Sequence, residues 1–134
     1  MKKTGLAAGA SAFHTLAIGQ GGESPNNKIN CAVVGCGGMG GYAVGEASKQ
    51  NLVAMCDLDT KRVAKAFKNH EKAPKFKDFR VMMDKMHKEI DAVSISTPDH
   101  THFAAAMCAM EHGKHVFIQK PLAHNIWQLR TLRK

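Results

Sequence analysis

Ile29-Asn30-Cys31-Ala32-Val33-Val34-Gly35-Cys36-Gly37-Gly38-Met39-Gly40 is the stretch that decides the fold of this chain. Its first half is apolar and predicts a buried strand, and its second half has the spacing G-x-G-x-x-G. The first glycine allows a tight turn into a helix, the second lets backbone approach a pyrophosphate, and the third lets the helix pack close to the strand. Amides at the helix N-terminus then favour phosphate. Glycine-rich turns are common, so the surrounding sequence has to supply the context.

Strand and helix patterns alternate along the rest of the chain. Thr60 is expected to cap the second helix, Thr97–His102 to form a turn that Pro98 enforces, and Val81, Met82 and Met86 to line the core side of a helix. Short connections between alternating elements predict an α/β fold, a doubly wound parallel sheet of order 3-2-1-4-5 with helices on both faces. We expect strands at 29–34, 51–56, 74–76, 92–96 and 115–118, and helices at 39–49, 61–69, 79–88, 103–111 and 125–133.

The carboxyl ends of parallel strands meet at one edge of such a sheet, where ligands bind. Asp57 follows the second strand and is expected to accept hydrogen bonds from the adenosine ribose hydroxyls. A carboxylate there repels a 2′-phosphate, which favours NAD over NADP, although Lys61 and Arg62 lie close enough to weaken the preference. Alternatively, Asp57 is a turn residue or a partner of a helix dipole. The other cofactor-binding candidates on this half are Gly35, Cys36, Gly37, Gly38, Met39 and Gly40.

The ends of the fourth and fifth strands are expected to lie over the nicotinamide half of the cofactor. Ser96, Thr97 and Pro98 follow the fourth strand, and Lys120 follows the fifth. Lys120 is the first catalytic candidate, because of this position at the nicotinamide end of the site. His102 is the second catalytic candidate, with a helix cap or a surface residue as its alternative role, and His100 is a weaker one.

These motifs together resemble the Gfo/Idh/MocA family of oxidoreductases, whose dinucleotide-binding domain has the Rossmann fold. The resemblance covers about residues 28–134. It implies a nicotinamide-dependent dehydrogenase of sugars, inositols or related polyols, in which Lys120 positions the nicotinamide ribose and a substrate hydroxyl. Gln119 departs from the family's usual Glu-Lys-Pro, and the run 119–127 looks most like an exported bacterial subgroup. The resemblance rests on the glycine turn, Cys56-Asp57, Thr97–His102, Gly113–Val116 and Gln119-Lys120-Pro121.

The resemblance also implies a second α/β domain that this sequence does not contain. In the family, that domain supplies a His and an Asp for proton abstraction, much of the substrate pocket, and a sheet through which subunits form homo-oligomers. We therefore expect the chain to be a fragment, one dinucleotide-binding domain that binds NAD weakly and turns over nothing by itself.

Composition and charge argue against several other classes of function. The chain has 134 residues and a net charge of +8, with many of its basic residues between Lys61 and Lys88. Nucleic acid is not an expected partner, because no aromatic residues interleave these charges, and a solvated helix face explains them. The four cysteines form no C-x-x-C pair and are expected to be free and mostly buried. His100-x-His102 and His112-x-x-His115 lack further ligands at metal-binding spacing, so no metal is expected.

Residues 1–27 differ from the rest of the chain. Lys2 and Lys3 precede a stretch rich in glycine and alanine, and a polar linker follows at 20–27. The stretch is too short and too weakly apolar to span a bilayer. It looks like the part of a twin-arginine signal that follows the arginine pair, which is missing here. We expect a truncated export signal to the periplasm, with a tail of a cytoplasmic protein as the alternative.

Three functions follow from the sequence. The first is the cofactor domain of a sugar or polyol dehydrogenase. The second is a non-catalytic module that senses NAD or binds a partner. It shares the glycine turn and Asp57 but has no need of Lys120 or of Thr97-Pro98. The third is a basic protein that binds nucleic acid, which would show steep salt dependence.

Overall fold

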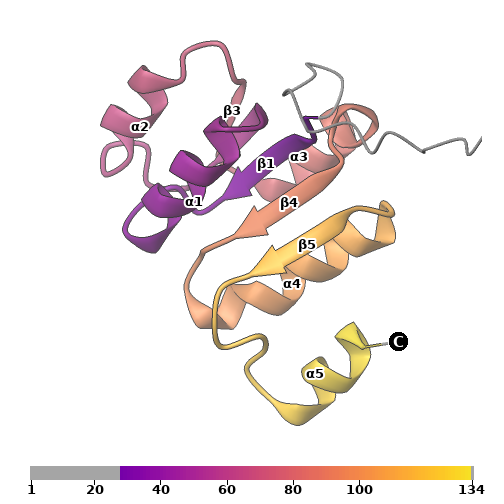
Figure 1. Cartoon of the computed structure of the whole chain (residues 1–134). Helices are drawn as coiled ribbons and strands as arrows, with labels where there is room; N and C mark the ends of the chain where they lie inside the picture. The colour runs from indigo at the N-terminus through magenta and orange to yellow at the C-terminus, as the bar shows by residue number, and fades with distance from the viewer. Residues whose placement is uncertain (1–27, 134) are drawn as a thin grey trace, which may run out of the picture.

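The computed structural model describes residues 28–133, so the expected export signal lies outside the described residues. The predicted fold class is confirmed: five parallel strands form one sheet in the order β3-β2-β1-β4-β5 (Figure 1). The strands are β1 (Asn30–Val34), β2 (Asn51–Cys56), β3 (Lys75–Phe76), β4 (Ala92–Ile95) and β5 (His115–Ile118). The helices are α1 (Met39–Ser48), α2 (Ala64–Asn69), α3 (Phe79–Met86), α4 (Asp99–Glu111) and α5 (Ile126–Leu132), with a 3₁₀ turn η2 at His87–Glu89.

Helices cover both faces of the sheet and bury two apolar clusters. The helices α1 and α2 pack on one face, where Val33 and Met55 meet Val44 and Ala47. On the other face α3 and α4 cover the larger cluster (Figure 1). The largest fully buried apolar side chains are Met55 in the first cluster and Met82, Met83, Ile90 and Ile95 in the second. The core role predicted for Met82 and Met86 of α3 is confirmed. The core role predicted for Val81 is wrong, since Val81 is 41% exposed and Met83 is buried in its place.

The second predicted helix begins later than expected. The structure has turns at 60–63 and starts α2 at Ala64, so Thr60 is not its cap. Instead, the Asp59 side chain accepts a hydrogen bond from the Arg62 amide at 3.0 Å, and its carbonyl accepts one from Val63 at 3.2 Å. This is the pairing of a side-chain N-cap, so Asp59, and not Thr60, caps the turn at 60–63 that leads into α2.

The predicted turn at 97–102 is also partly wrong. The structure places 99–102 in the first turn of α4, after Pro98. The Pro98 carbonyl accepts from both the amide and the hydroxyl of Thr101, at 2.9 and 2.8 Å, which starts the helix. Asp99 lies in the first turn, where the helix dipole favours an acid.

The structure also shows where the cysteines and the basic residues lie. All four cysteines are free, with Cys36 and Cys56 buried and the other two half-buried. The lysines of the basic segment are exposed, as a solvated surface requires, except for Lys75 in β3, which is half-buried and donates to the His70 and Ala73 carbonyls. Within residues 28–133, no helix is long and apolar enough to cross a bilayer.

Candidate cofactor-binding site

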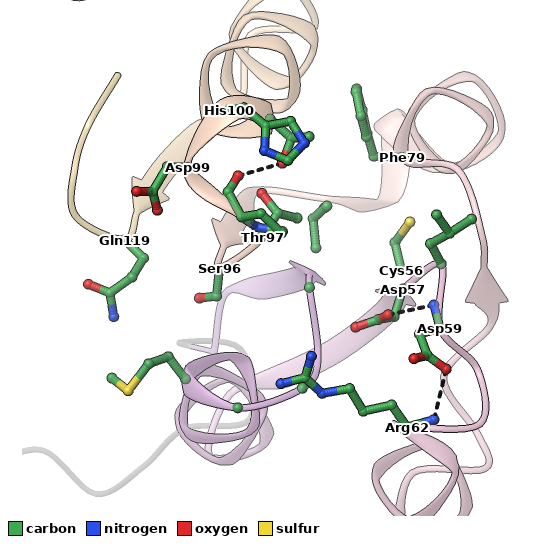
Figure 2. A pocket seen from close by; sticks show the side chains of 18 of the residues that line it. Cys56, Asp57, Asp59, Arg62, Phe79, Ser96, Thr97, Asp99, His100 and Gln119 are labelled. Carbon is green, nitrogen blue, oxygen red and sulfur yellow. Dashed lines mark hydrogen bonds between the residues drawn. The ribbon is translucent and has the colours of Figure 1, made fainter. Parts of the chain in front are cut away.

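A cleft lies at the carboxyl edge of the sheet. It has a volume of about 880 Å³ and is lined from β1, β2, β4 and β5 and from the segment that follows β3 (Figure 2). The structure brings together nearly all the candidates, since Gly35, Gly37, Gly38, Met39, Asp57, Ser96, Thr97, Pro98 and Lys120 line it. The other three candidates, Cys36, Gly40 and His102, are buried and do not line the cleft.

The glycine turn is built by close packing. Gly35 has φ +83°, and a Cβ there would lie 2.7 Å from the Ser96 carbonyl carbon. A Cβ at Gly40 would lie 1.8 Å from the Gly35 carbonyl oxygen. These two positions therefore accept only glycine, and they press the start of α1 against the ends of β1 and β4.

The N-terminus of α1 opens toward the cleft with free donors. Within residues 28–133, the amides of Gly37, Gly38 and Met39 have no hydrogen-bond partner, and no side chain caps the helix. The first turn of α1 carries no acidic residue. The buried hydroxyl oxygen of Thr97 also lacks a partner. Unpaired amides at a helix N-terminus, free of competing carboxylates, fit a pyrophosphate.

The Asp57 carboxylate is fixed at the end of β2. Its Oδ2 accepts from the Cys36 amide at 2.7 Å, and its Oδ1 accepts from the Asp59 amide at 2.9 Å. Each carboxylate oxygen keeps a further lone pair, so the group can still accept from two ribose hydroxyls. Asp57 thus anchors the glycine turn and faces the cleft at the same time (Figure 2).

Arg62 lies closer to the glycine turn than its place in the sequence indicated. A Cβ at Gly38 would lie 3.5 Å from the Arg62 Nη2, so the guanidinium lies directly over the turn. The side chain extends across the mouth of the cleft toward the turn (Figure 2). This places one positive charge beside the space that a phosphate or an adenosine would occupy.

Lys120 reaches the cleft from the end of β5. The Gln119 amide donates to the Ile95 carbonyl at 2.9 Å, which continues the β4–β5 ladder to the edge. The Gln119 side chain accepts from the Lys120 amide at 2.9 Å, and both residues line the cleft. The glutamine that departs from the family's Glu-Lys-Pro thus orients the backbone of the lysine.

The structure places His102 apart from the cleft. The side chain is 1% exposed and lies inside α4, and both of its ring nitrogens contact backbone carbonyls. No ring nitrogen is left to face a ligand. The expected surface role is therefore excluded by burial, and His100 takes the position on the lining of the cleft.

Sequence reasoning missed the wall formed after β3. Asp78, Phe79 and Arg80 line the cleft, with the Asp78 side chain capping α3 by accepting from the Arg80 amide at 2.9 Å. The Arg80 guanidinium lies 5.7 Å from the centre of the Phe79 ring. Their position directly after a strand was the available clue, because β3 ends at the same edge as the other strands.

Two buried thiols make the stability of the fold sensitive to alkaline pH. Burial raises the pKa of Cys36 to about 12, with a further contribution from Asp57. Burial likewise raises the pKa of Cys56 to about 12, with Cys36 and Asp78 as charged neighbours. The folded chain then binds more protons than the unfolded chain above the ordinary thiol pKa of 9.0, so stability falls as pH rises through this range.

We expect the urea midpoint to be lower at about pH 10.5 than at about pH 8. The double variant Cys36→Ala, Cys56→Ala is the control, because it removes both thiols and keeps the other titrating groups. It should show a smaller drop between the two pH values. An equal drop in both proteins would contradict a contribution from these thiols.

Comparison with known proteins identifies the family. The model of the Gfo/Idh/MocA oxidoreductase family, NAD-binding Rossmann fold, matches residues 29–134. A glycosyl hydrolase family 109 protein of Solibacter usitatus is 31% identical over 120 residues, which cover 78% of this chain and 27% of that protein. An inositol 2-dehydrogenase of Rubrobacter xylanophilus is 34% identical over 103 residues, 73% of this chain and 28% of that protein.

A solved structure gives the same relationship. Scyllo-inositol dehydrogenase from Lactobacillus casei, with bound NAD(H) and scyllo-inositol, superposes with a TM-score of 0.69 at 28% identity, covering 78% of this chain and 32% of that chain. The chain thus spans about a third or less of the length of these relatives. With the cleft, the glycine turn and the sheet order in agreement, the chain belongs to the Gfo/Idh/MocA oxidoreductase family as an NAD-binding Rossmann domain.

Proposed function

We propose that this domain binds NAD in preference to NADP and holds it for hydride exchange with a carbon atom of a sugar or polyol. The observation that carries the proposal is the Asp57 carboxylate, fixed by two amides beside the glycine turn, with Lys120 on the same cleft. A fixed negative charge at this position favours two ribose hydroxyls over a 2′-phosphate. A purely sensory domain has no need of the lysine.

The proposed chemistry uses the two ends of the cleft differently. Bound NAD supplies a hydride acceptor at its nicotinamide ring. Lys120 would donate a hydrogen bond to the substrate hydroxyl oxygen, where negative charge develops as the C–H bond breaks. The names of the inositol dehydrogenases among the relatives support a polyhydroxylated substrate. The base that takes the hydroxyl proton is expected in the second domain.

Calorimetric titration of this chain with NAD and NADP tests the cofactor. Asp57→Ser should weaken NAD binding about tenfold, because the ribose hydroxyls lose a charged acceptor. The same change should leave NADP binding equal or stronger, since Arg62 stays beside the turn and no carboxylate opposes the 2′-phosphate. Adding Arg62→Ala to Asp57→Ser should then weaken NADP binding.

Asp91→Asn is the matched control. Its carboxylate also accepts from a strand amide, that of Asn30 at 2.8 Å, but at the other end of β1. It should leave both affinities unchanged. Tighter binding of NADP than NAD by the unsubstituted chain would contradict the proposed preference, and binding of neither nucleotide would contradict the proposed function.

A second candidate function is cleavage of a glycosidic bond. Relatives that are 31 to 35% identical carry the name glycosyl hydrolase family 109 protein. If a sugar carbon gives a hydride to NAD and later takes it back, the sugar is not oxidised overall. While that carbon is oxidised, bonds at the neighbouring carbons are easier to break. A protein of the relatives' full length, supplied with glycosides and with polyols, separates the two. Released sugar without NADH accumulation supports hydrolysis, and NADH accumulation supports a dehydrogenase.

A further inference from the structure

His102 is the one polar side chain in the described part of the chain that is fully buried, at 1% exposure. Its Nδ1 lies 2.7 Å from the Pro121 carbonyl oxygen and its Nε2 lies 2.8 Å from the Thr97 carbonyl oxygen. Thr97 lies five residues before His102, in the connection that leads into α4, whereas Pro121 lies 19 residues after it. The imidazole therefore connects α4 to two separate loops at the edge of the sheet.

Both partners of the ring are acceptors. A backbone carbonyl only accepts hydrogen bonds, and a neutral imidazole donates from one nitrogen alone. The His102 ring therefore donates to one of the two carbonyl oxygens and lies at contact distance from the other, so one side chain lies against both segments.

The two loops joined by His102 both belong to the cleft. Thr97 follows β4 and lines the cleft, and its backbone carbonyl is the one that contacts His102. Pro121 directly follows Lys120, at the start of the loop between β5 and α5. At its start, the Gln119 amide still continues the β4–β5 ladder by donating to the Ile95 carbonyl. After that point, the other hydrogen bonds of this loop are short-range: the Lys120 amide to the Gln119 side chain and the His124 amide to the Gln128 side chain. The His102 contact thus ties the residue after Lys120 to the body of the domain.

We propose that His102 is a positioning residue that holds the loop after β5 so that Lys120 reaches the cofactor. This inference rests on the proposed function for its effect on cofactor binding. The contact itself concerns the free protein and is tested separately. His102 would act through Lys120 and the backbone of Thr97, and not by touching substrate.

The contact of the ring with the loop has a direct spectroscopic readout. In the chain labelled with ¹⁵N-histidine, the His102 ring should show an N–H correlation that is protected from exchange with water, assigned by its loss in His102→Gln. His112 provides the comparison on the same helix, since only its Nδ1 contacts a carbonyl, that of Cys108 at 2.8 Å, four residues away. A His102 ring N–H that exchanges as fast as that of His112 would overturn the proposal. This readout does not depend on NAD binding.

The coupling to Lys120 is measured by NAD titration of a double-mutant cycle. His102→Phe removes the ring nitrogens from two partly buried carbonyls and should weaken NAD binding roughly tenfold. In a Lys120→Met background the same change should cost less than about twofold, because the group that it misplaces is already gone. His102→Gln, which keeps a donor, should recover part of the affinity, and His112→Gln should change nothing. Equal losses with and without Lys120 would overturn the positioning role, whereas an unsubstituted chain that fails to bind NAD would instead contradict the proposed function.

Discussion

Gly40→Ala is expected to destabilise the folded chain by about 3 kcal/mol or more and to abolish measurable NAD binding. The new Cβ would lie 1.8 Å from the Gly35 carbonyl oxygen and 2.6 Å from its carbonyl carbon. Both are backbone atoms, so no side chain can rotate away, and α1 has to move off β1. That movement separates the amides of the glycine turn from the Asp57 carboxylate. Urea unfolding and NAD titration measure the two effects.

Gly45→Ala is the matched control within the same helix. A Cβ at Gly45 meets nothing within 4 Å, and the residue lies in α1 as Gly40 does. Alanine is a better helix former than glycine, so this variant should gain about 0.5–1 kcal/mol and keep its NAD affinity. If both variants shifted stability in the same direction, the close packing of Gly40 on Gly35 would not be what requires glycine.

The sheet order could be predicted from the sequence because its causes are local and regular. Five apolar runs, each followed by a helical segment, leave little choice once the crossovers are right-handed. The same regularity placed Asp57, Thr97 and Lys120 at one edge, since each follows directly on a strand. For these residues, position along a strand was sufficient evidence of position in the site.

The features that could not be predicted depend on contacts between segments that are distant in the sequence. His102 was placed near the cleft because it follows the fourth strand, but the direction of its ring follows from the Pro121 carbonyl, 19 residues away. The Arg62 guanidinium lies over the glycine turn, more than 20 residues before it in the chain. The hydrogen bond from the Arg62 amide to the Asp59 side chain is local, but it does not by itself tell where the long side chain ends.

Lys120→Met is expected to lower the turnover of a protein of the relatives' full length by roughly 10²–10³-fold, with about a tenfold loss of NAD affinity. The larger effect on turnover follows if the ammonium group stabilises charge that develops only as hydride leaves the alcohol carbon. Lys120→Arg keeps the charge but changes its geometry, and it should recover part of the turnover. Steady-state kinetics with an inositol substrate and NAD titration measure the two quantities.

Lys114→Met is the control, because Lys114 precedes the same strand that Lys120 follows. The strand β5 separates the two lysines, and only Lys120 lies at the carboxyl edge of the sheet where the cleft is. Loss of the Lys114 charge should leave both turnover and affinity unchanged. If Lys120→Met weakened NAD binding and turnover equally, the lysine would serve the cofactor alone. A normal turnover in Lys120→Met would place the source of alkoxide stabilisation elsewhere in the enzyme.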